Sequence, residues 1–310
     1  MAKKPPSRGK GKGGTFDRIV IAGIIIALIA IVLTLWGPLR KYRLAEEKKP
    51  AVQTKKQEPQ QKKTGPKDKK QVKEAKKHAE SLVAGSFEKT SLIAIVIDDL
   101  GQDVKQAKEV LALPGNITVA VLPGLAQSKD VANLAKQAGH EVLLHMPMEP
   151  LKNHEKTKTP GTLSADMTPM AFLTTVSDDV ESVPGAVGVN NHEGSALTEN
   201  KEAMKFLMAE LKTRNLFFLD SLTNAKSVAY ATAIEFGMKS ARRDVFLDNE
   251  GDNPEYIRKQ LDELVEIARN HGKAIGIGHP HPVTLSELRK WLAETDSQGI
   301  EIVPVSRLMN

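Results

Sequence analysis

Short apolar runs and amphipathic stretches alternate along the chain from Leu92 to its C-terminal end. The apolar runs are rich in β-branched residues, which suits strands that are buried on both faces of a parallel sheet. The stretches between them suit helices. This alternation predicts a parallel α/β sheet with right-handed crossovers, either open or closed into a barrel. The apolar runs are residues 92–97, 117–122, 141–144, 186–189, 216–219, 244–247, 273–277 and 300–303.

Polar side chains follow most of these runs. Asp98 and Asp99 follow the first run, and His145 follows the third, with Glu149 four residues later. Because the carboxyl ends of parallel strands meet at one edge or rim, these side chains are expected to converge on a shared site. The remaining polar residues at run ends are Asn190, Asn191, His192, Asp220, Ser221, Asp248, Asn249, His279 and His281.

The residue types at these ends indicate divalent metal chemistry. Neutral imidazoles with carboxylates suit zinc, iron, cobalt or manganese, and the chain has no cysteine to offer instead. Such a metal activates water for hydrolysis while a free carboxylate takes the proton. A serine nucleophile, Ser195 or Ser221 beside His192, is the alternative, although the sequence has no Gly-x-Ser-x-Gly elbow. A phosphate-binding glycine loop is also missing, which argues against nucleotide chemistry.

The first ninety residues have a different composition. Residues 1–18 form a basic tail, which is expected to be disordered and cytoplasmic. Residues 19–36 are uncharged and just long enough to cross a bilayer, with Trp36 as an interfacial anchor. This run is long for a signal peptide and lacks a convincing cleavage site, so it predicts an uncleaved transmembrane helix. Residues 37–90 are rich in Lys and Gln and predict a flexible linker.

The basic residues before the span favour a cytoplasmic N-terminus. The chain is therefore expected to cross the inner (cytoplasmic) membrane once, with its folded domain, residues 91–310, on the exported side, either periplasmic or extracellular. The formal charge of +6 comes from the first ninety residues and not from the folded part. The sequence therefore predicts no nucleic-acid partner.

Five motifs carry a resemblance to a known family. In order, they are IVIDDLG, GHEVLLHMPMEP, GVNNHEGS, FFLDS and GIGHPHP. On these motifs, residues 92–308 resemble the polysaccharide deacetylase superfamily, and in particular its divergent branch of envelope proteins. The resemblance implies a distorted (β/α)7-type barrel and metal-dependent removal of acyl groups from N-acetylated sugars.

The resemblance also implies roles for individual residues. Asp98 matches the general base of the family, and Asp99 matches its metal-binding aspartate. His145 takes the place of the first metal histidine. Glu149 stands where the second metal histidine would follow, and His192 is the candidate for the missing imidazole ligand.

The remaining assignments concern the later strands. His279 matches the histidine that acts as general acid on the leaving amine. Asp220 and Asp248 are expected to hydrogen-bond and orient the histidines, and Asn191 is a further candidate for a supporting role.

Two functions follow from this reading. The first is a membrane-anchored carbohydrate deacetylase that uses a divalent metal, zinc, on an N-acetylated cell-envelope polysaccharide. The second is a non-catalytic envelope protein that binds glycan or a protein partner through a degenerate deacetylase cleft. Glu149 in a ligand position favours the second, and so does the anchor with its flexible tether, which suits a protein that positions others.

Overall fold

The computed structural model describes residues 90–151 and 159–310. The predicted basic tail, the predicted transmembrane helix and nearly all of the predicted linker lie outside the described residues. Within the two described ranges, no helix has the length and apolar character that a membrane crossing requires.

Strands and helices alternate through the described residues, and each of the eight predicted apolar runs overlaps a strand. One further strand, β6, has no predicted counterpart, because its three residues form no apolar run. The elements are β1 (Ser91–Leu100), α3 (Val104–Leu111), β2 (Thr118–Val121), α4 (Ser128–Gln137), β3 (Glu141–Met148), α5 (Pro169–Ser182), β4 (Gly188–Glu193), α6 (Lys201–Thr213), β5 (Phe217–Asp220), α7 (Ala229–Glu235), β6 (Ser240–Arg242), β7 (Val245–Phe246), α8 (Pro254–His271), β8 (Lys273–Gly278), α9 (Pro282–Leu292), β9 (Ile300–Ile302) and the short 3-10 helix η3 (Val305–Leu308).

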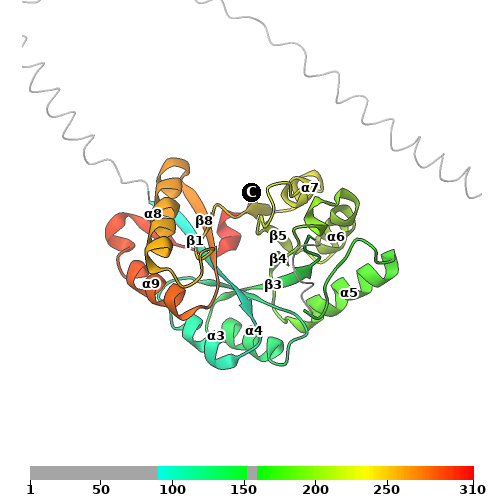
Figure 1. Cartoon of the computed structure of the whole chain (residues 1–310), viewed down its shortest axis with the longest axis horizontal. Coiled ribbons are helices and arrows are strands. Elements are labelled where there is room, and N and C mark those ends of the chain that lie inside the picture. The colour runs from blue at the N-terminus through cyan, green and yellow to red at the C-terminus, as the bar shows by residue number, and fades with distance from the viewer. Residues whose placement is uncertain (1–89, 152–158) are drawn as a thin grey trace, which may run out of the picture. The chain divides into compact units, whose positions relative to one another are not determined.

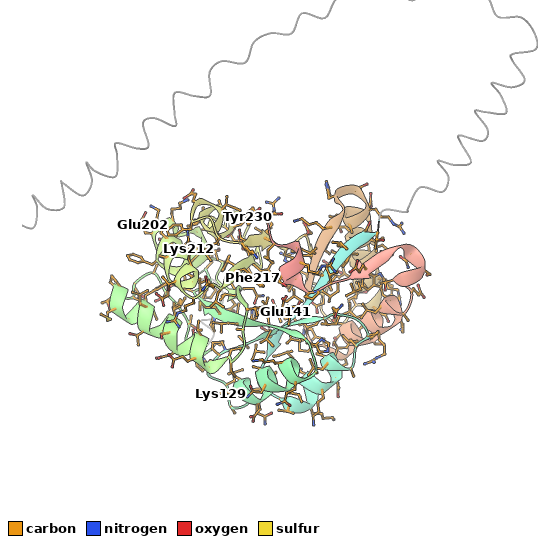
Figure 2. The ribbon with its side chains drawn as sticks, turned by 180° about the vertical axis from the view of Figure 1, so that it is seen from behind. Lys129, Glu141, Glu202, Lys212, Phe217 and Tyr230 are labelled. Atoms are coloured by element: carbon orange, nitrogen blue, oxygen red, sulfur yellow. The ribbon has the colours of Figure 1, made fainter. Side chains whose placement is uncertain are left out.

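All strand pairs in the described part are parallel. The strand order is β6-β5-β4-β3-β2-β1-β8-β7, and β9 also pairs with β1. The helices follow one another in an arc around the outside of the curved sheet (Figure 1). Charged side chains such as Lys129 and Glu202 lie on these outer helices (Figure 2). This parallel α/β half-barrel fits the barrel that the family resemblance implies.

One short segment, residues 240–246, links the two edges of the sheet. Its strands β6 and β7 stand at opposite ends of the strand order but are separated only by Arg243 and Asp244. The backbone N–H of Arg243 donates to the carbonyl of Asp220 on β5, at 2.9 Å. The next N–H, of Asp244, donates to the carbonyl of Ile275 on β8, also at 2.9 Å. The segment therefore pairs first with one edge and then with the other.

Successive side chains of each strand alternate between two apolar layers. On β1, Ile93, Ile95 and Ile97 pack in the larger cluster between the sheet and the helices. Ala94 and Val96 belong to a second cluster inside the barrel, which η3 helps to fill. The interior of the barrel is therefore a packed core, and a site can form only where this apolar filling ends.

The same alternation carries polar residues to the carboxyl end of the interior. Asp98, His145 and His279 each stand two residues beyond a side chain of the inner apolar cluster. Residues two apart in a strand share a face, so these three side chains continue the inner face past its apolar part. The fold thus turns an apolar interior into a polar rim at one end.

A buried carboxylate on α5 lies outside this rim. Asp179 is 5% exposed, and its Oδ2 atom has no hydrogen-bond partner in the described part of the chain. Burial, helped by the neighbouring charge of Asp178, raises the pKa of Asp179 to about 8. The folded state therefore favours the neutral, protonated carboxyl at this position.

This shift makes stability depend on pH. In an unfolded chain the pKa of an aspartate is about 3.9. Between this pH and pH about 8, the folded chain therefore holds a proton at Asp179 that the unfolded chain has lost. We expect the free energy of unfolding to fall as pH rises through this window, by at most about 1.4 kcal/mol per pH unit from this group. Asp179→Asn should flatten the slope. Urea denaturation at pH 5 and pH 8 tests this, and an equal pH dependence in both proteins would contradict it.

Candidate metal centre

The two aspartates at the end of β1 reach the rim together because the strand is irregular there. The pairing register between β1 and β2 shifts between Ile97 and Leu100. Asp99 has a φ of 60°, in the left-handed region that non-glycine residues seldom adopt. In a regular strand, Asp98 and Asp99 would face opposite sides of the sheet. The bulge turns the chain so that both carboxylates face the same histidines.

Three donor atoms converge beside Asp99. Its Oδ1 atom lies 2.9 Å from Nδ1 of His192 on β4 and 3.1 Å from Nε2 of His145 on β3. The two imidazole nitrogens are 3.2 Å apart. Asp99 Oδ1 is buried, yet it accepts no well-formed hydrogen bond. One carboxylate oxygen and two imidazole nitrogens that face one another suit a divalent metal such as zinc, with positions left open for water.

Charge and burial set the protonation of these groups. Burial alone would raise the pKa of Asp99, but His145 and His192 outweigh it and hold this pKa below its ordinary value. For Asp98 burial prevails over the nearby imidazoles, and its pKa is raised. Burial would lower the pKa of His145, yet Asp98 and then Asp99 raise it above its usual range. Asp99 is therefore the charged partner of the two histidines.

Asn190, on β4, connects a metal-ligand candidate to the second aspartate. Its Oδ1 atom accepts a hydrogen bond from Nδ1 of His145 at 2.9 Å. Its Nδ2 atom donates to Asp98 Oδ1 at 2.9 Å and to Ser221 Oγ at 3.2 Å. Because an amide oxygen can only accept, Nδ1 of His145 carries a proton, and its Nε2 atom faces Asp99 and His192. Asn190 is fully buried, so this arrangement is fixed.

His279 faces the cluster from the far side, just past β8. Its Nδ1 atom lies 3.0 Å from Asp248 Oδ1, and its backbone N–H donates to Asp248 Oδ2 at 2.7 Å. The hydroxyl of Thr284 donates to the same Oδ2 at 2.9 Å. Nε2 of His279 lies 3.8 Å from Asp99 Oδ2. Burial lowers the pKa of His279, but the bond to Asp248 and the charges of Asp98 and Asp99 raise it to about 9, so its imidazole is protonated at neutral pH.

A second group of potential ligands, Asp248, His279 and His281, lies beside this pair. Both oxygens of Asp248 already accept hydrogen bonds from His279, and one also accepts from Thr284. By contrast, Asp99 Oδ1 has no hydrogen-bond partner in the described part of the chain. The group around Asp99 is therefore the better candidate for the metal.

Two residues predicted for the site make their contacts elsewhere. Glu149 lies just past β3, and its Oε2 atom accepts a hydrogen bond from the backbone N–H of Ala165 at 3.1 Å. The sequence also predicts that Asp220 orients a histidine. Its carboxylate instead accepts from the N–H groups of Leu222 and Tyr230 and from the hydroxyl of Ser227. Asp220 thus organises the turn between β5 and α7.

Asn191 also has a different role from the one predicted. Its side chain accepts from the N–H of Ser221 at 2.9 Å and donates to the carbonyl of Glu193 at 2.8 Å. It ties the ends of two strands together, whereas Asn190 enters the site. The two-residue period of the strand could have identified Asn190 as a site residue, because Asn190 shares a face with His192 and Asn191 does not.

Arg243 was not singled out by the sequence at all. It donates through Nε to the carbonyl of Ser221 at 2.7 Å and through Nη2 to that of Leu222 at 2.9 Å. Its guanidinium lies 4.8 Å from the ring centroid of Phe246, whose ring meets that of His279 edge-on. No pattern marks this arginine, because it belongs to the short link between β6 and β7.

Comparison with known proteins identifies the family of this chain. The family model described as divergent polysaccharide deacetylase matches residues 95–309. The chain belongs to the divergent polysaccharide deacetylase family. This confirms the resemblance carried by the five sequence motifs.

Proteins from several bacteria are similar to this chain. The chain is 39% identical over 218 residues to uncharacterized protein YibQ of Escherichia coli (strain K12). The aligned region covers 70% of this chain and 67% of that protein. An uncharacterized protein of Haemophilus influenzae (strain ATCC 51907 / DSM 11121 / KW20 / Rd) is 36% identical over 218 residues, or 70% of this chain and 76% of that one. The crystal structure of uncharacterized protein ATU2773 from Agrobacterium tumefaciens C58 has a TM-score of 0.68 at 28% identity, covering 71% of this chain and 89% of that chain.

The contacts of Asn190 predict its effect on metal binding. Asn190→Ala removes the acceptor that fixes the His145 tautomer, so we expect zinc affinity to fall about 10- to 100-fold. Ser221→Ala is the matched control, because it removes one partner of Asn190 and leaves the His145 contact intact. Competition against a fluorescent zinc chelator measures both affinities, with circular dichroism as the check on folding. Wild-type affinity in the Asn190→Ala protein would contradict the assigned role.

Proposed function

We propose that this divergent polysaccharide deacetylase family member is a membrane-anchored, zinc-dependent deacetylase of an N-acetylated cell-envelope polysaccharide. One observation carries the proposal. Asp99 Oδ1 and the imidazole nitrogens of His145 and His192 converge within 3.2 Å of one another. They stand opposite His279, which has a carboxylate partner of its own. This combination suits hydrolysis of an amide bond.

Each residue has a role in such a hydrolysis. Asp99, His145 and His192 would hold the zinc ion, which, when bound, polarises the amide carbonyl and lowers the pKa of water. Asp98, oriented by Asn190, takes a proton from the attacking water. The water oxygen bonds to the acyl carbon as the C–N bond breaks.

The leaving group needs a proton of its own. His279, held by Asp248, donates that proton to the leaving amine. The products are acetate and a free amino sugar. Of the two carboxylates at the end of β1, Asp99 would thus bind the metal and Asp98 would accept the proton.

The anchoring part of the proposal rests on the sequence. The uncharged run at 19–36 supports a single crossing of the inner membrane, and the basic residues before it support a cytoplasmic N-terminus. The folded domain would then meet its glycan on the exported side. The linker at 37–90 would let the domain search the envelope around its anchor.

A non-catalytic envelope protein that binds glycan or a protein partner is the second candidate. The observation that favours it is Glu149, which stands at the position of the second metal histidine and bonds to Ala165 instead of the cluster. In that case, the cleft would still bind glycan or a protein partner but would no longer catalyse hydrolysis. Activity measurements separate the two functions.

We expect the zinc-loaded full chain to release acetate from N-acetylated chitooligosaccharides or peptidoglycan. Asp98→Asn should keep its zinc and lose about 10²- to 10⁴-fold in kcat, because it removes the proton acceptor. Asp99→Ala should lose both zinc and activity. Asp130→Asn, an exposed change on α4, is the matched control. Acetate release and elemental analysis are the two measurements.

Two results would count against the catalytic proposal. Wild-type protein that takes up no zinc after reconstitution would remove the mechanism. Protein that binds zinc and glycan but releases no acetate, with Asp98→Asn binding equally well, would identify the non-catalytic function instead.

A further inference from the structure

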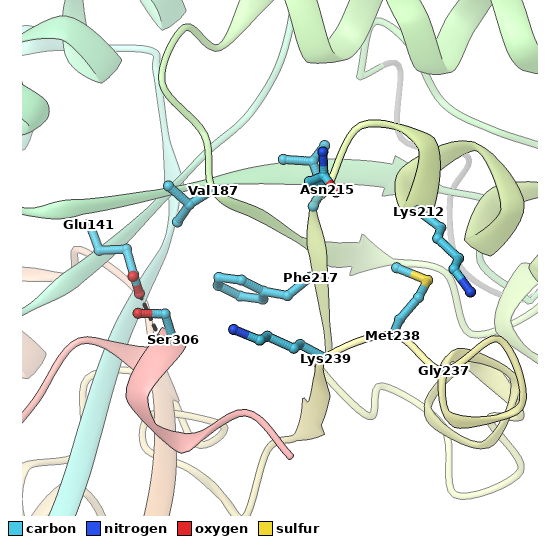
Figure 3. A pocket seen from close by; sticks show the side chains of 10 residues that line it. Glu141, Val187, Lys212, Asn215, Phe217, Gly237, Met238, Lys239 and Ser306 are labelled. Carbon is cyan, nitrogen blue, oxygen red and sulfur yellow. Dashed lines mark hydrogen bonds between the residues drawn. The ribbon is translucent and has the colours of Figure 1, made fainter.

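A cavity lined by Glu141, Val187 and Phe217, among others, opens at one end of the barrel (Figure 3). It lies around the amino ends of β3, β4 and β5, and its volume of about 580 Å³ falls within the range of small-molecule sites. Along β3, Glu141 in this cavity and His145 in the metal centre are four residues apart, a rise of about 13 Å. Apolar side chains of the inner cluster, including Leu143 on the same strand, lie between the two ends. The cavity is therefore a separate place in the fold.

The charged groups of this cavity leave positive charge unpaired. The carboxylate of Glu141 already accepts hydrogen bonds from the N–H of Ser306, at 3.0 Å, and from the hydroxyl of Thr118, at 3.4 Å. Lys212 donates to the carbonyl of Phe236 and has no carboxylate partner among residues 90–151 and 159–310. The ammonium group of Lys239 makes no hydrogen bond or ion pair with any residue of the described ranges. Glu141, Lys212 and Lys239 are the only charged side chains lining this cavity in those ranges, and they leave it positive.

The wall between these charges is apolar and is held in place. A Cβ atom on Gly188 would lie 2.4 Å from the ring of Phe217, so the absence of a side chain at this position makes room for the ring. Val187, next to this glycine, is 43% exposed on the same wall. In Figure 3 the Phe217 ring and the Lys239 side chain both extend toward the side where Glu141 and Ser306 lie. A ligand there meets a ring and a cation together.

We propose that this cavity binds an organic phosphate, a phosphate ester with an apolar or planar body. The phosphate lies at the Lys239 ammonium, because lysine binds phosphate as a compact point charge. The body packs on Phe217 and Val187, and Lys212 adds to the positive potential that favours an anionic ligand. Either a phospholipid headgroup or a soluble phosphate ester supplies this chemistry.

The first test uses phenyl phosphate with the full chain held in dodecyl maltoside micelles, which contain no phosphate. Saturation-transfer NMR measures binding of phenyl phosphate, phenol and inorganic phosphate. We expect the Kd of phenyl phosphate to be at least about tenfold lower than that of either control, because phenol lacks the phosphate and inorganic phosphate lacks the ring. Lys239→Gln should raise the Kd for phenyl phosphate at least about fivefold. Val187→Glu should abolish binding, because it brings a negative charge into the cavity that repels the phosphate. Lys259→Gln, an exposed lysine on α8 outside the cavity, is the matched control and should bind as wild type does.

Some results would overturn the proposal, and others would identify the source of the phosphate ester. No binding of phenyl phosphate at millimolar concentration, or equal binding by wild type, Lys239→Gln and Val187→Glu, would overturn the proposal. Inorganic phosphate that binds as tightly as phenyl phosphate would overturn the assigned role of the apolar wall. Displacement of the probe when phosphatidylglycerol is added to the micelles would support a lipid source. Retention of the probe in those mixed micelles would support a soluble one.

Discussion

The irregular end of β1 is the constraint on which the metal centre depends. Two consecutive strand residues share a site only where the strand departs from its regular pleat. The left-handed conformation of Asp99 makes this departure, and such a conformation costs about 1–3 kcal/mol in a non-glycine residue. The chain resumes its sheet contacts at once, since the carbonyl of Leu100 accepts from the N–H of Leu122 at 2.8 Å. Strain is thus confined to the residue that faces the histidines.

Burial makes the consequences of that geometry large. Asp98, His145 and Asn190 are all within 3% of full burial, so their charges and dipoles act with little screening by water. Each charge is placed against a group that compensates it, and Asn190 supplies both a donor and an acceptor. The converging atoms of Asp99, His145 and His192 form a group that could hold a cation. The most deeply buried residues around it, Asp98, His145 and Asn190, are fixed by their hydrogen bonds to one another.

Much of this arrangement could be predicted because it follows from simple periodicities. Buried strands were visible as apolar runs, and parallel topology gathers their carboxyl ends, which brought Asp98, Asp99, His145, His192 and His279 to one rim. The need of a histidine for an orienting partner suggested Asp220 and Asp248 for that role, and the structure pairs Asp248 with His279. These inferences need only the direction of the strands and the chemistry of the side chains.

The errors came from contacts that periodicity does not specify. Applying the two-residue period at His192 would have selected Asn190 in place of Asn191. Asp220 sits at a strand end like the others, but the turn after β5 uses its carboxylate for its own N–H groups. Glu149 turns toward the loop at Ala165, and Arg243 belongs to a link too short to have a pattern. Local turn chemistry decided each of these cases.

The pairing of β1 has a consequence for how the protein is made. The first strand of the domain pairs with β8 and β9, which are the last strands to be synthesised. Until they emerge from the ribosome, one side of a strongly apolar strand has no partner, and such strands are prone to aggregate. Contacts so distant in sequence also slow folding. The sheet of this domain is therefore closed around its first strand only when its last strands are available.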